Sequence, residues 1–345
     1  MTIVLEYDES KGIYLLDKIR VIVLPKGSIE VIQNSVNSIL GLATKGIFQE
    51  VASTVFYSFI QDLIKTKAIR FRGSSAKNEL FDLFNNMGFG RITEITQDLN
   101  SSKISIEGNY NSYLNIISNS AFCFNSIGLL NGIYRSITNR DVEVIEKKCR
   151  STGDSDADFF DVNVSETKSQ YNYIPSQFFE GKNEQNKKVD IVKDEKDICI
   201  NLIPSEIIPV TYFPYLFSKL RKIIGQGVYG IENQAGKEVA KLYQQYNLGL
   251  IQEKYNLKGL EVMSIISGIG KIETIKTELG YLKDVVVNNS FNALHIDEAI
   301  EKRCFLLASL ISALSYKLTG NILRLNEKEC SAVNNNNLCK FSFQE

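Results

Sequence analysis

Four residues in the last part of the chain have side chains that could bind a metal ion: Cys304, Glu327, Cys330 and Cys339. Thiolates together with one carboxylate form a donor set that suits tetrahedral Zn²⁺. Four protein ligands fill a tetrahedral site and leave no position for a water molecule. We therefore expect a structural rather than a catalytic zinc ion.

The same spacing of candidate ligands occurs 181 positions earlier in the chain, at Cys123, Glu146, Cys149 and Asp158. An aspartate here replaces the last cysteine, and carboxylate oxygen is also a zinc ligand. We therefore expect a second metal site here, in which an aspartate takes the place of the last thiolate. Of the six cysteines, only Cys199 lies outside this scheme.

Two other interpretations of the cysteines remain open. Cys330 and Cys339 could form a disulfide, although this would leave Cys304 single and would have no counterpart at Asp158. The thiols could also be small residues of the core, because free cysteine is often buried. The first residues, MTIVLEYDESKG, lack the basic and apolar regions of a signal peptide. We therefore expect a cytoplasmic protein, in which cysteines are more often free or metal-bound than paired.

Several elements must converge to bring these ligands together. Cys304 opens an apolar stretch, CFLLASLISAL, that predicts a buried helix, and we expect the helix dipole to lower its thiol pKa. Cys330 falls in the turn before the last strand, and Cys339 opens that strand, CKFSF. The start of the helix, the turn at Cys330 and the start of the last strand could therefore meet at one point.

The carboxylates are predicted to lie on apolar strand faces. Alternation places Leu323, Leu325 and Glu327 on one face of a strand, and Val142, Val144 and Glu146 repeat this pattern. A carboxylate that continues an apolar face is costly unless it meets a cation. The pattern therefore favours a metal ion at both places.

Longer stretches of sequence also repeat, at offsets of 179 to 181 positions. The matched pairs are residues 86–95 with 266–275, 19–32 with 198–211, and 121–149 with 302–330. Such self-similarity predicts two homologous domains, which we place at residues 1–165 and 198–345. Residues 166–197 between them are rich in charged and amide side chains and are typical of a solvated linker. Its aromatic part, YNYIPSQFF, could pack back onto a domain.

The coarse pattern of each copy predicts an α+β fold. A strand comes first and ends at Pro25 or Pro204, and amphipathic helices follow over about residues 28–67 and 213–256. A further helix leads into a Gly-x-Gly turn, which is followed by alternating strands, the apolar helix and a final pair of strands. We therefore expect two homologous domains, each with helices packed on a mainly antiparallel sheet.

Composition excludes some classes of partner. The chain has 345 residues, of which 44% are hydrophobic and 23% charged, so a sizeable core is expected. The net charge of −1 provides no electrostatic attraction for nucleic acid or for an anionic membrane. The most apolar stretch, residues 304–314, is too short to span a bilayer, so we expect no membrane insertion.

Three further signals are weak. Residues 225–230 read GQGVYG, but a helical pattern precedes them where a dinucleotide site needs a strand. His295 is the only histidine, and no oriented partner is identifiable, so we expect no catalytic residues and no enzymatic activity. Gly128 and Gly132 lie one turn apart and predict close packing of their helix against the sheet.

The pattern of Cys, then a small-residue helix, then Glu-x-x-Cys, then Cys resembles the 4-vinyl reductase (4VR) domain, a predicted hydrocarbon-binding family. The Gly-x-Gly turn of IISGIGKI and the sequence Asn289-Ser290-Phe291 before the cysteine helix carry the resemblance further. The resemblance covers both halves outside the linker and is stronger in the second, because Asp158 replaces the last cysteine in the first. It implies a fold like that of the vesicle-tethering TRAPP subunits and of haem-based nitric-oxide sensors, with a sheet of about four strands beside a hydrophobic cavity.

The resemblance implies a binding protein rather than a reductase. We expect a sensor or carrier of a hydrophobic small molecule that is stabilised by structural zinc. The alternative is a scaffold that docks protein partners, as TRAPP subunits do. Because the family often dimerises, we expect the two copies to pack as an intramolecular pseudo-symmetric dimer, with further homo-oligomerisation left open.

Overall fold

The computed structural model describes residues 4–69, 75–97, 100–110, 114, 123–153, 155–170, 173–177, 186–189, 191–194, 197–276, 282–291, 304–334 and 338–343. Mixed helices and antiparallel sheets confirm the predicted α+β class.

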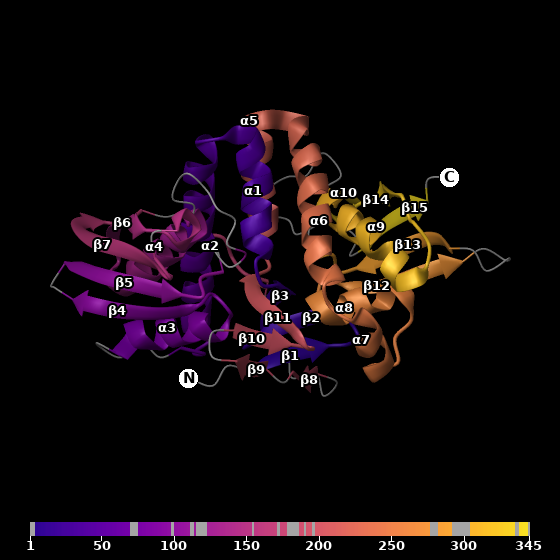
Figure 1. The fold of residues 1–345 in the computed structure, drawn as a ribbon, viewed down its shortest axis with the longest axis horizontal. Helices are drawn as coiled ribbons and strands as arrows, with labels where there is room; N and C mark the ends of the chain where they lie inside the picture. Colours follow the sequence, from indigo (N-terminus) through magenta and orange to yellow (C-terminus); the bar gives the residue numbers. More distant parts are fainter. Residues whose placement is uncertain are drawn as a thin grey trace.

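A seven-stranded sheet lies at the centre of the molecule and contains strands from both halves (Figure 1). Its order is β8-β1-β2-β3-β11-β10-β9, and every neighbouring pair is antiparallel. The strands are β1 (Leu5–Asp8), β2 (Ile13–Leu16), β3 (Ile19–Pro25), β8 (Asn186–Lys188), β9 (Ile191–Asp194), β10 (Asp197–Ile200) and β11 (Ile203–Pro209). The pairing of β3 with β11 joins the halves, and every residue of β3 is buried.

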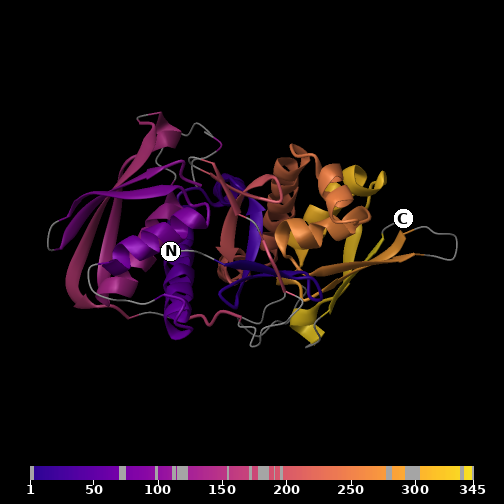
Figure 2. The ribbon, with the colours of Figure 1, turned by 90° about the horizontal axis from the view of Figure 1, so that it is seen from below.

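Each half also has its own four-stranded antiparallel sheet, and the two sheets have the same strand order. In the first half the order is β4-β5-β7-β6, with β4 (Arg91–Gln97), β5 (Ser101–Glu107), β6 (Arg140–Lys148) and β7 (Ala157–Lys168). In the second half it is β12-β13-β15-β14, with β12 (Lys271–Lys276), β13 (Leu282–Asn288), β14 (Leu325–Glu329) and β15 (Leu338–Phe343). These two sheets lie at opposite ends of the molecule, on either side of the central sheet (Figure 2).

Some of the helices stand above the central sheet, and others lie at its level beside the outer sheets (Figure 1). The first half contains α1 (Ser28–Leu40), α2 (Ala43–Lys65), α3 (Ser75–Asn86) and α4 (Phe124–Thr138). The second contains α5 (Tyr212–Ile224), α6 (Val228–Gln244), α7 (Leu248–Lys254), α8 (Val262–Ser267), α9 (Phe305–Thr319) and α10 (Ser331–Asn334). Short 3₁₀ turns span Arg150–Thr152, Gly225–Gly227 and Gly259–Glu261.

Glycines allow two helix pairs to approach closely. A Cβ on Gly128 of α4 would lie 2.5 Å from the Cβ of Ala52 in α2, and a Cβ on Gly132 would lie 3.0 Å from the nitrogen of Tyr57. In the second half Gly236 of α6 has the same role, because a Cβ at this position would lie 2.7 Å from the Cβ of Ser309 in α9. The sequence correctly predicted close packing at Gly128, but the partner is a helix and not the sheet.

The Gly-x-Gly turn of each half packs against the strands of the other half. A Cβ on Gly88, whose φ is +89°, would lie 2.3 Å from the carbonyl oxygen of Ser205. Gly268 lies against Tyr14, and the N–H of Gly270 donates to the carbonyl of Gly12 at 3.1 Å. The halves are therefore joined through strands and turns as well as through the packing of α1 on α6 and of α2 on α5.

One predicted strand boundary is wrong. Pro204 does not end a strand, because it lies within β11 and pairs with Cys199 of β10. The chain turns at Asn201 and Leu202, both of which have positive φ. Pro209, at the end of β11, is the structural counterpart of Pro25 at the end of β3. The prediction aligned β3 with β10 instead of with β11, because both of these strands are apolar.

The described residues of the polar segment 166–197 contribute to the fold. It contributes β8 and β9 to the two edges of the central sheet and the first residue of β10. Its aromatic part packs back on α2, where the N–H of Ile174 donates to Ser58 Oγ at 3.0 Å and that of Ser176 to Asp62 Oδ2 at 2.8 Å. The domain limits 1–165 and 198–345 stay a prediction, since these strands tie both halves to one sheet.

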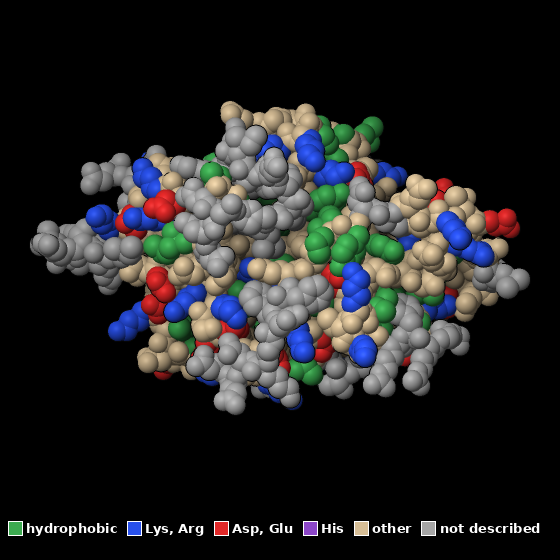
Figure 3. Space-filling model, turned by 180° about the vertical axis from the view of Figure 1, so that it is seen from behind, with side chains coloured by type: hydrophobic (Ala, Val, Ile, Leu, Met, Phe, Trp, Pro, Cys, Tyr) green, Lys and Arg blue, Asp and Glu red, His purple; other side chains and the backbone are tan. Residues whose placement is uncertain are grey.

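Across the described residues, no helix is both long and apolar enough to cross a bilayer. On the face shown in Figure 3, acidic and basic side chains are interspersed and neither sign gathers into one patch.

Candidate metal centres

Four predicted ligands meet in the second half. Cys304 is the N-cap of α9, Glu327 lies on β14, Cys330 follows that strand, and Cys339 lies on β15. One ligand atom from each residue lies within 4.8 Å of all the others, and all four residues are buried. The structure therefore brings the whole predicted set together, from one helix end and two paired strands.

Hydrogen bonds hold this second cluster in place. The backbone N–H of Cys304 donates to Glu327 Oε2 at 3.1 Å, so the first turn of α9 orients the carboxylate. The N–H of Ser331 donates to the sulfur of Cys339 at 3.5 Å. The sulfurs of Cys304 and Cys339 lie 3.2 Å apart, and Ser290 Oγ lies 3.7 Å from Cys304 Sγ.

The first half contains the corresponding cluster. Cys123 is the N-cap of α4, Glu146 lies on β6, Cys149 precedes the 3₁₀ turn, and Asp158 lies on β7. Their ligand atoms also lie within 4.8 Å of one another. Three of these residues are buried, whereas Glu146 is only half-buried.

A residue that the sequence analysis missed holds the first cluster. Asn109 Nδ2 donates to Asp158 Oδ2 at 2.8 Å and lies 3.6 Å from Cys123 Sγ, and its own Oδ1 accepts from Ser126 Oγ at 2.9 Å. The N–H of Arg150 donates to Asp158 Oδ1 at 2.6 Å.

The repeat could have revealed these supporting residues. Asn109 corresponds to Ser290 at the same offset of 181, and each lies against the first cysteine of its cluster. Arg150 corresponds to Ser331, and each backbone N–H donates to the fourth candidate ligand. Both halves therefore share the supporting contacts as well as the ligand positions.

Burial dominates the acid-base properties of the clusters. It raises the pKa of Cys304 and of Cys123 well above the usual value for a thiol, so the lowering that the helix dipole predicts for Cys304 is wrong. It also raises the pKa of Glu327 to about 8, and that of Glu146 well above its usual range. The pKa of Cys339 is lowered instead, chiefly by the hydrogen bond from the Cys304 thiol.

The donor sets fit a metal ion. Four acidic groups that share one buried volume cannot all ionise unless a cation lies among them. Tetrahedral Zn²⁺ with bonds of about 2.0–2.3 Å sets its ligand atoms roughly 3.3–3.8 Å apart, which agrees with clusters no wider than 4.8 Å. In the first cluster, Glu146 Oε1 is buried and has no hydrogen-bond partner in the described part of the chain. None of the six cysteines is in a disulfide, so the structure does not contain the alternative bond between Cys330 and Cys339.

A pocket of about 460 Å³ lies directly beside the first cluster, between α2, α4 and β6. Glu146 lines it, and the other walls are partly apolar and partly polar: Phe124, Ile127 and Val144 on one hand, and Gln49, Asn131 and Glu143 on the other. The pocket therefore combines a hydrophobic surface with a few polar groups, as small-molecule sites usually do.

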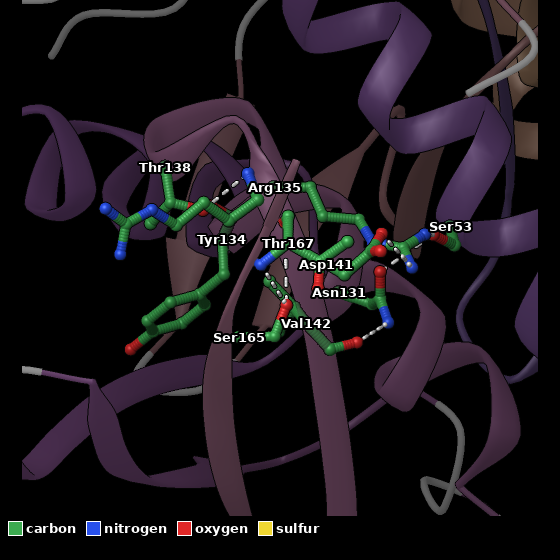
Figure 4. A network of polar contacts seen from close by, with 10 residues as sticks. Ser53, Asn131, Tyr134, Arg135, Thr138, Asp141, Val142, Ser165 and Thr167 are labelled. Atoms are coloured by element: carbon green, nitrogen blue, oxygen red, sulfur yellow. Dashed lines mark hydrogen bonds and ion pairs between the residues drawn. The ribbon is translucent and has the colours of Figure 1, made fainter. Parts of the chain in front are cut away.

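Asn131 fixes one wall of this pocket (Figure 4). Its Nδ2 donates to the carbonyl of Val142 on β6 at 2.8 Å, and its Oδ1 accepts from Ser53 Oγ of α2 at 3.0 Å. Arg135 donates to the same hydroxyl at 3.0 Å. A single amide thus ties α4 to both of its neighbours at the edge of the pocket.

The remaining sequence signals do not form sites in the described structure. Residues 225–230 form a 3₁₀ turn and the start of α6, and helix α5 precedes them, so the strand that a dinucleotide fingerprint requires is missing there. His295 lies outside the described residues.

No protein-family model and no curated protein matches this sequence. Among solved structures, the phenol-responsive sensory domain of the transcription activator PoxR, bound to phenol, aligns with 46% of this chain and 84% of its own, at 18% identity and a TM-score of 0.40. A trafficking protein particle complex subunit 3 from Naegleria fowleri, covalently bound to palmitic acid, aligns over 42% and 98%, at 12% identity and a TM-score of 0.31.

A vinyl-4-reductase family protein from Methanocaldococcus jannaschii aligns over 40% of this chain and 92% of its own, at 22% identity and a TM-score of 0.25. Each of the three alignments covers less than half of the present chain, so the likeness is partial.

Proposed function

We propose that this chain is a binding protein with two 4VR-like halves, which acts as a sensor or carrier of a hydrophobic small molecule. The observation that carries the proposal is the pocket of about 460 Å³ beside the first cluster. Its apolar wall would receive the body of the ligand, and its amide groups would orient a polar substituent.

Zinc would have a structural role in this protein. In the second half the ligands would be Cys304, Glu327, Cys330 and Cys339, and in the first half Cys123, Glu146, Cys149 and Asp158. When bound, the ion would neutralise the buried carboxylate and thiolates and would cross-link a helix end to two strands. The chain itself supplies the orientation, through the amides of Cys304, Arg150 and Ser331.

A second candidate function is a scaffold that docks a protein partner. It is favoured by exposed apolar side chains at the corresponding helix turns of both halves, namely Ile39 and Leu42 at the end of α1 and just after it, and Ile223 in α5. Leu42 is 94% exposed, and Ile39 and Ile223 are each 58% exposed.

Native mass spectrometry of the protein from its own cells separates these two functions. A co-purified apolar molecule supports the sensor or carrier, and a co-purified polypeptide supports the scaffold. Recombinant protein can then be titrated with the fluorescent probe 1-anilinonaphthalene-8-sulfonate. Val144→Phe, which fills the pocket, should weaken probe binding, whereas Leu325→Phe at the corresponding position of β14 should not. Equal binding by both variants and the wild type would place the probe elsewhere.

A further inference from the structure

The two clusters differ in their access to solvent. Glu327 is buried with 8% of its surface exposed, whereas its counterpart Glu146 is half-buried and lines the pocket. The rim of the pocket carries Lys45, Glu143 and Ile145, all of which are exposed. A solvent-borne group can therefore reach the first cluster along a path that passes Glu146.

One position at the start of the second helix of each half differs beside the two clusters. Gly41 and Gly225 end α1 and α5 with nearly the same backbone angles, φ +55° and +58°, so they match at an offset of 184. By this match Tyr229 of α6 corresponds to Lys45 of α2. The ring of Tyr229 stacks on Phe305 with a centroid distance of 4.2 Å and an interplanar angle of 28°. Phe124, the counterpart of Phe305, lines the pocket instead.

The carboxylates are also held differently. Glu327 Oε2 accepts the N–H of Cys304, which couples its position to the first turn of α9. The Glu146 carboxylate instead has the thiols of Cys149 and Cys123 as its hydrogen-bond partners. The donor sets also favour tighter metal binding by the second cluster, because it offers three thiols and the first cluster only two. Fewer thiolates bind a soft or borderline cation such as Zn²⁺ less tightly.

We propose that the first cluster exchanges its metal ion with solution through this pocket, whereas the second cluster retains its ion. The first half would thus sense metal supply, and the second would stay permanently cross-linked. Exchange is a ligand substitution without redox change: the Glu146 carboxylate leaves the ion, and a donor atom of the incoming chelator takes its place. This proposal rests on the zinc assignment of the proposed function.

Metal release from the full-length zinc-loaded chain tests the proposal, with 4-(2-pyridylazo)resorcinol as the chromogenic chelator. We expect two phases of equal amplitude, each equivalent to one zinc ion per chain. Cys149→Ser should remove the fast phase and Cys330→Ser the slow phase. Release of two equivalents at one common rate would overturn the proposal while leaving the zinc assignment intact, whereas a chain that binds no zinc would refute both.

Reciprocal exchange of the residues at the pocket then assigns the cause. Lys45→Tyr should slow the fast phase by about tenfold or more, and Tyr229→Lys should accelerate the slow phase by a similar factor, because the shell around a metal controls solvent access. Lys45→Phe is a second closing variant, for use if Lys45→Tyr unfolds, and circular dichroism reports folding. Lys241→Tyr, on the exposed side of α6, is the control and should change neither rate. Rates that are insensitive to Lys45→Tyr, Lys45→Phe and Tyr229→Lys would overturn the proposal.

Discussion

At the scale of single residues, Glu206 shows how the halves depend on each other. It is fully buried on β11 of the second half, and its Oε1 accepts the N–H of Ile29, in the first turn of α1 in the first half, at 2.9 Å. The N-cap residue of that helix is Gly27, which has no side chain to serve as a cap. A carboxyl oxygen from the other half therefore caps α1.

Burial raises the pKa of Glu206 to about 8, and the charge of Glu30 adds to this effect. The hydrogen bond from Ile29 and the charge of Lys26 act in the opposite direction. A raised pKa means that the folded state binds the proton more tightly than the unfolded state, whose pKa is near 4.5. The free energy of unfolding should therefore decrease as the pH rises from about 4.5 to about 8 and level off above that.

Glu206→Gln keeps the oxygen that accepts from Ile29 and removes the charge. We expect no gain in melting temperature near pH 4.5 and a gain of about a few degrees at pH 8 and above. Thermal unfolding followed by circular dichroism across this range provides the measurement, with the exposed Glu143→Gln as the control. A difference between variant and wild type that does not change with pH would contradict the assignment.

Cys330→Ser tests the second cluster at the same scale. Zinc analysis should show the loss of one equivalent per chain, and the melting temperature should fall because structural zinc contributes directly to folding. The matched control is Cys199→Ser, which lies on β10 outside both clusters and should retain all zinc. Full zinc content in the Cys330→Ser protein would exclude this residue as a ligand.

At the scale of elements, the approach of α2 to α4 depends on Gly128. A Cβ there would lie 2.5 Å from Ala52 Cβ and 2.7 Å from the carbonyl oxygen of Gln49, so Gly128→Ala should destabilise the protein by about 1–3 kcal/mol. A Cβ on Gly46 of α2 would meet no atom within 4 Å, and Gly46→Ala should instead stabilise the helix by about 0.5–1 kcal/mol. Urea unfolding measures both, and equal effects would show that helix propensity alone decides.

At the scale of the whole molecule, the shared central sheet should make the two halves unfold together. Gly88 tests this coupling, because a Cβ at this position would meet the carbonyl oxygen of Ser205 in the other half at 2.3 Å. Gly320 has a comparable φ of +75° with no atom within 4 Å, so Gly320→Ala measures the cost of the left-handed backbone alone, about 1–2 kcal/mol.

We expect Gly88→Ala to lower the melting temperature clearly more than Gly320→Ala does, while each variant and the wild type keep a single calorimetric transition. The single transition is expected because β3 and β11 pair in one sheet. Two resolved transitions, or equal effects of the two substitutions, would show that the halves are independent.

The sequence by itself determined the repeat, the α+β class and the two sets of four candidate ligands. These features are legible because they depend on residue type and spacing: an apolar helix that begins at Cys304, an apolar strand face that continues at Glu327, and a second copy 181 positions earlier. The four residues of each set also come together in three dimensions. This happens because a helix end and two paired strands place equally spaced residues at equivalent points of the two halves.

Only the tertiary structure decided what lies around these residues. Local pattern did not reveal that β11 rather than β10 pairs with β3, because both strands are apolar and the choice depends on contacts between distant segments. It also predicted a lowered pKa for Cys304, whereas complete burial raises it. In the sequence, the difference between Lys45 and its counterpart Tyr229 looks like an ordinary difference between two surface residues. Its effect on solvent access depends on whether a ring lies over a phenylalanine, and that is settled by packing between helices rather than by sequence.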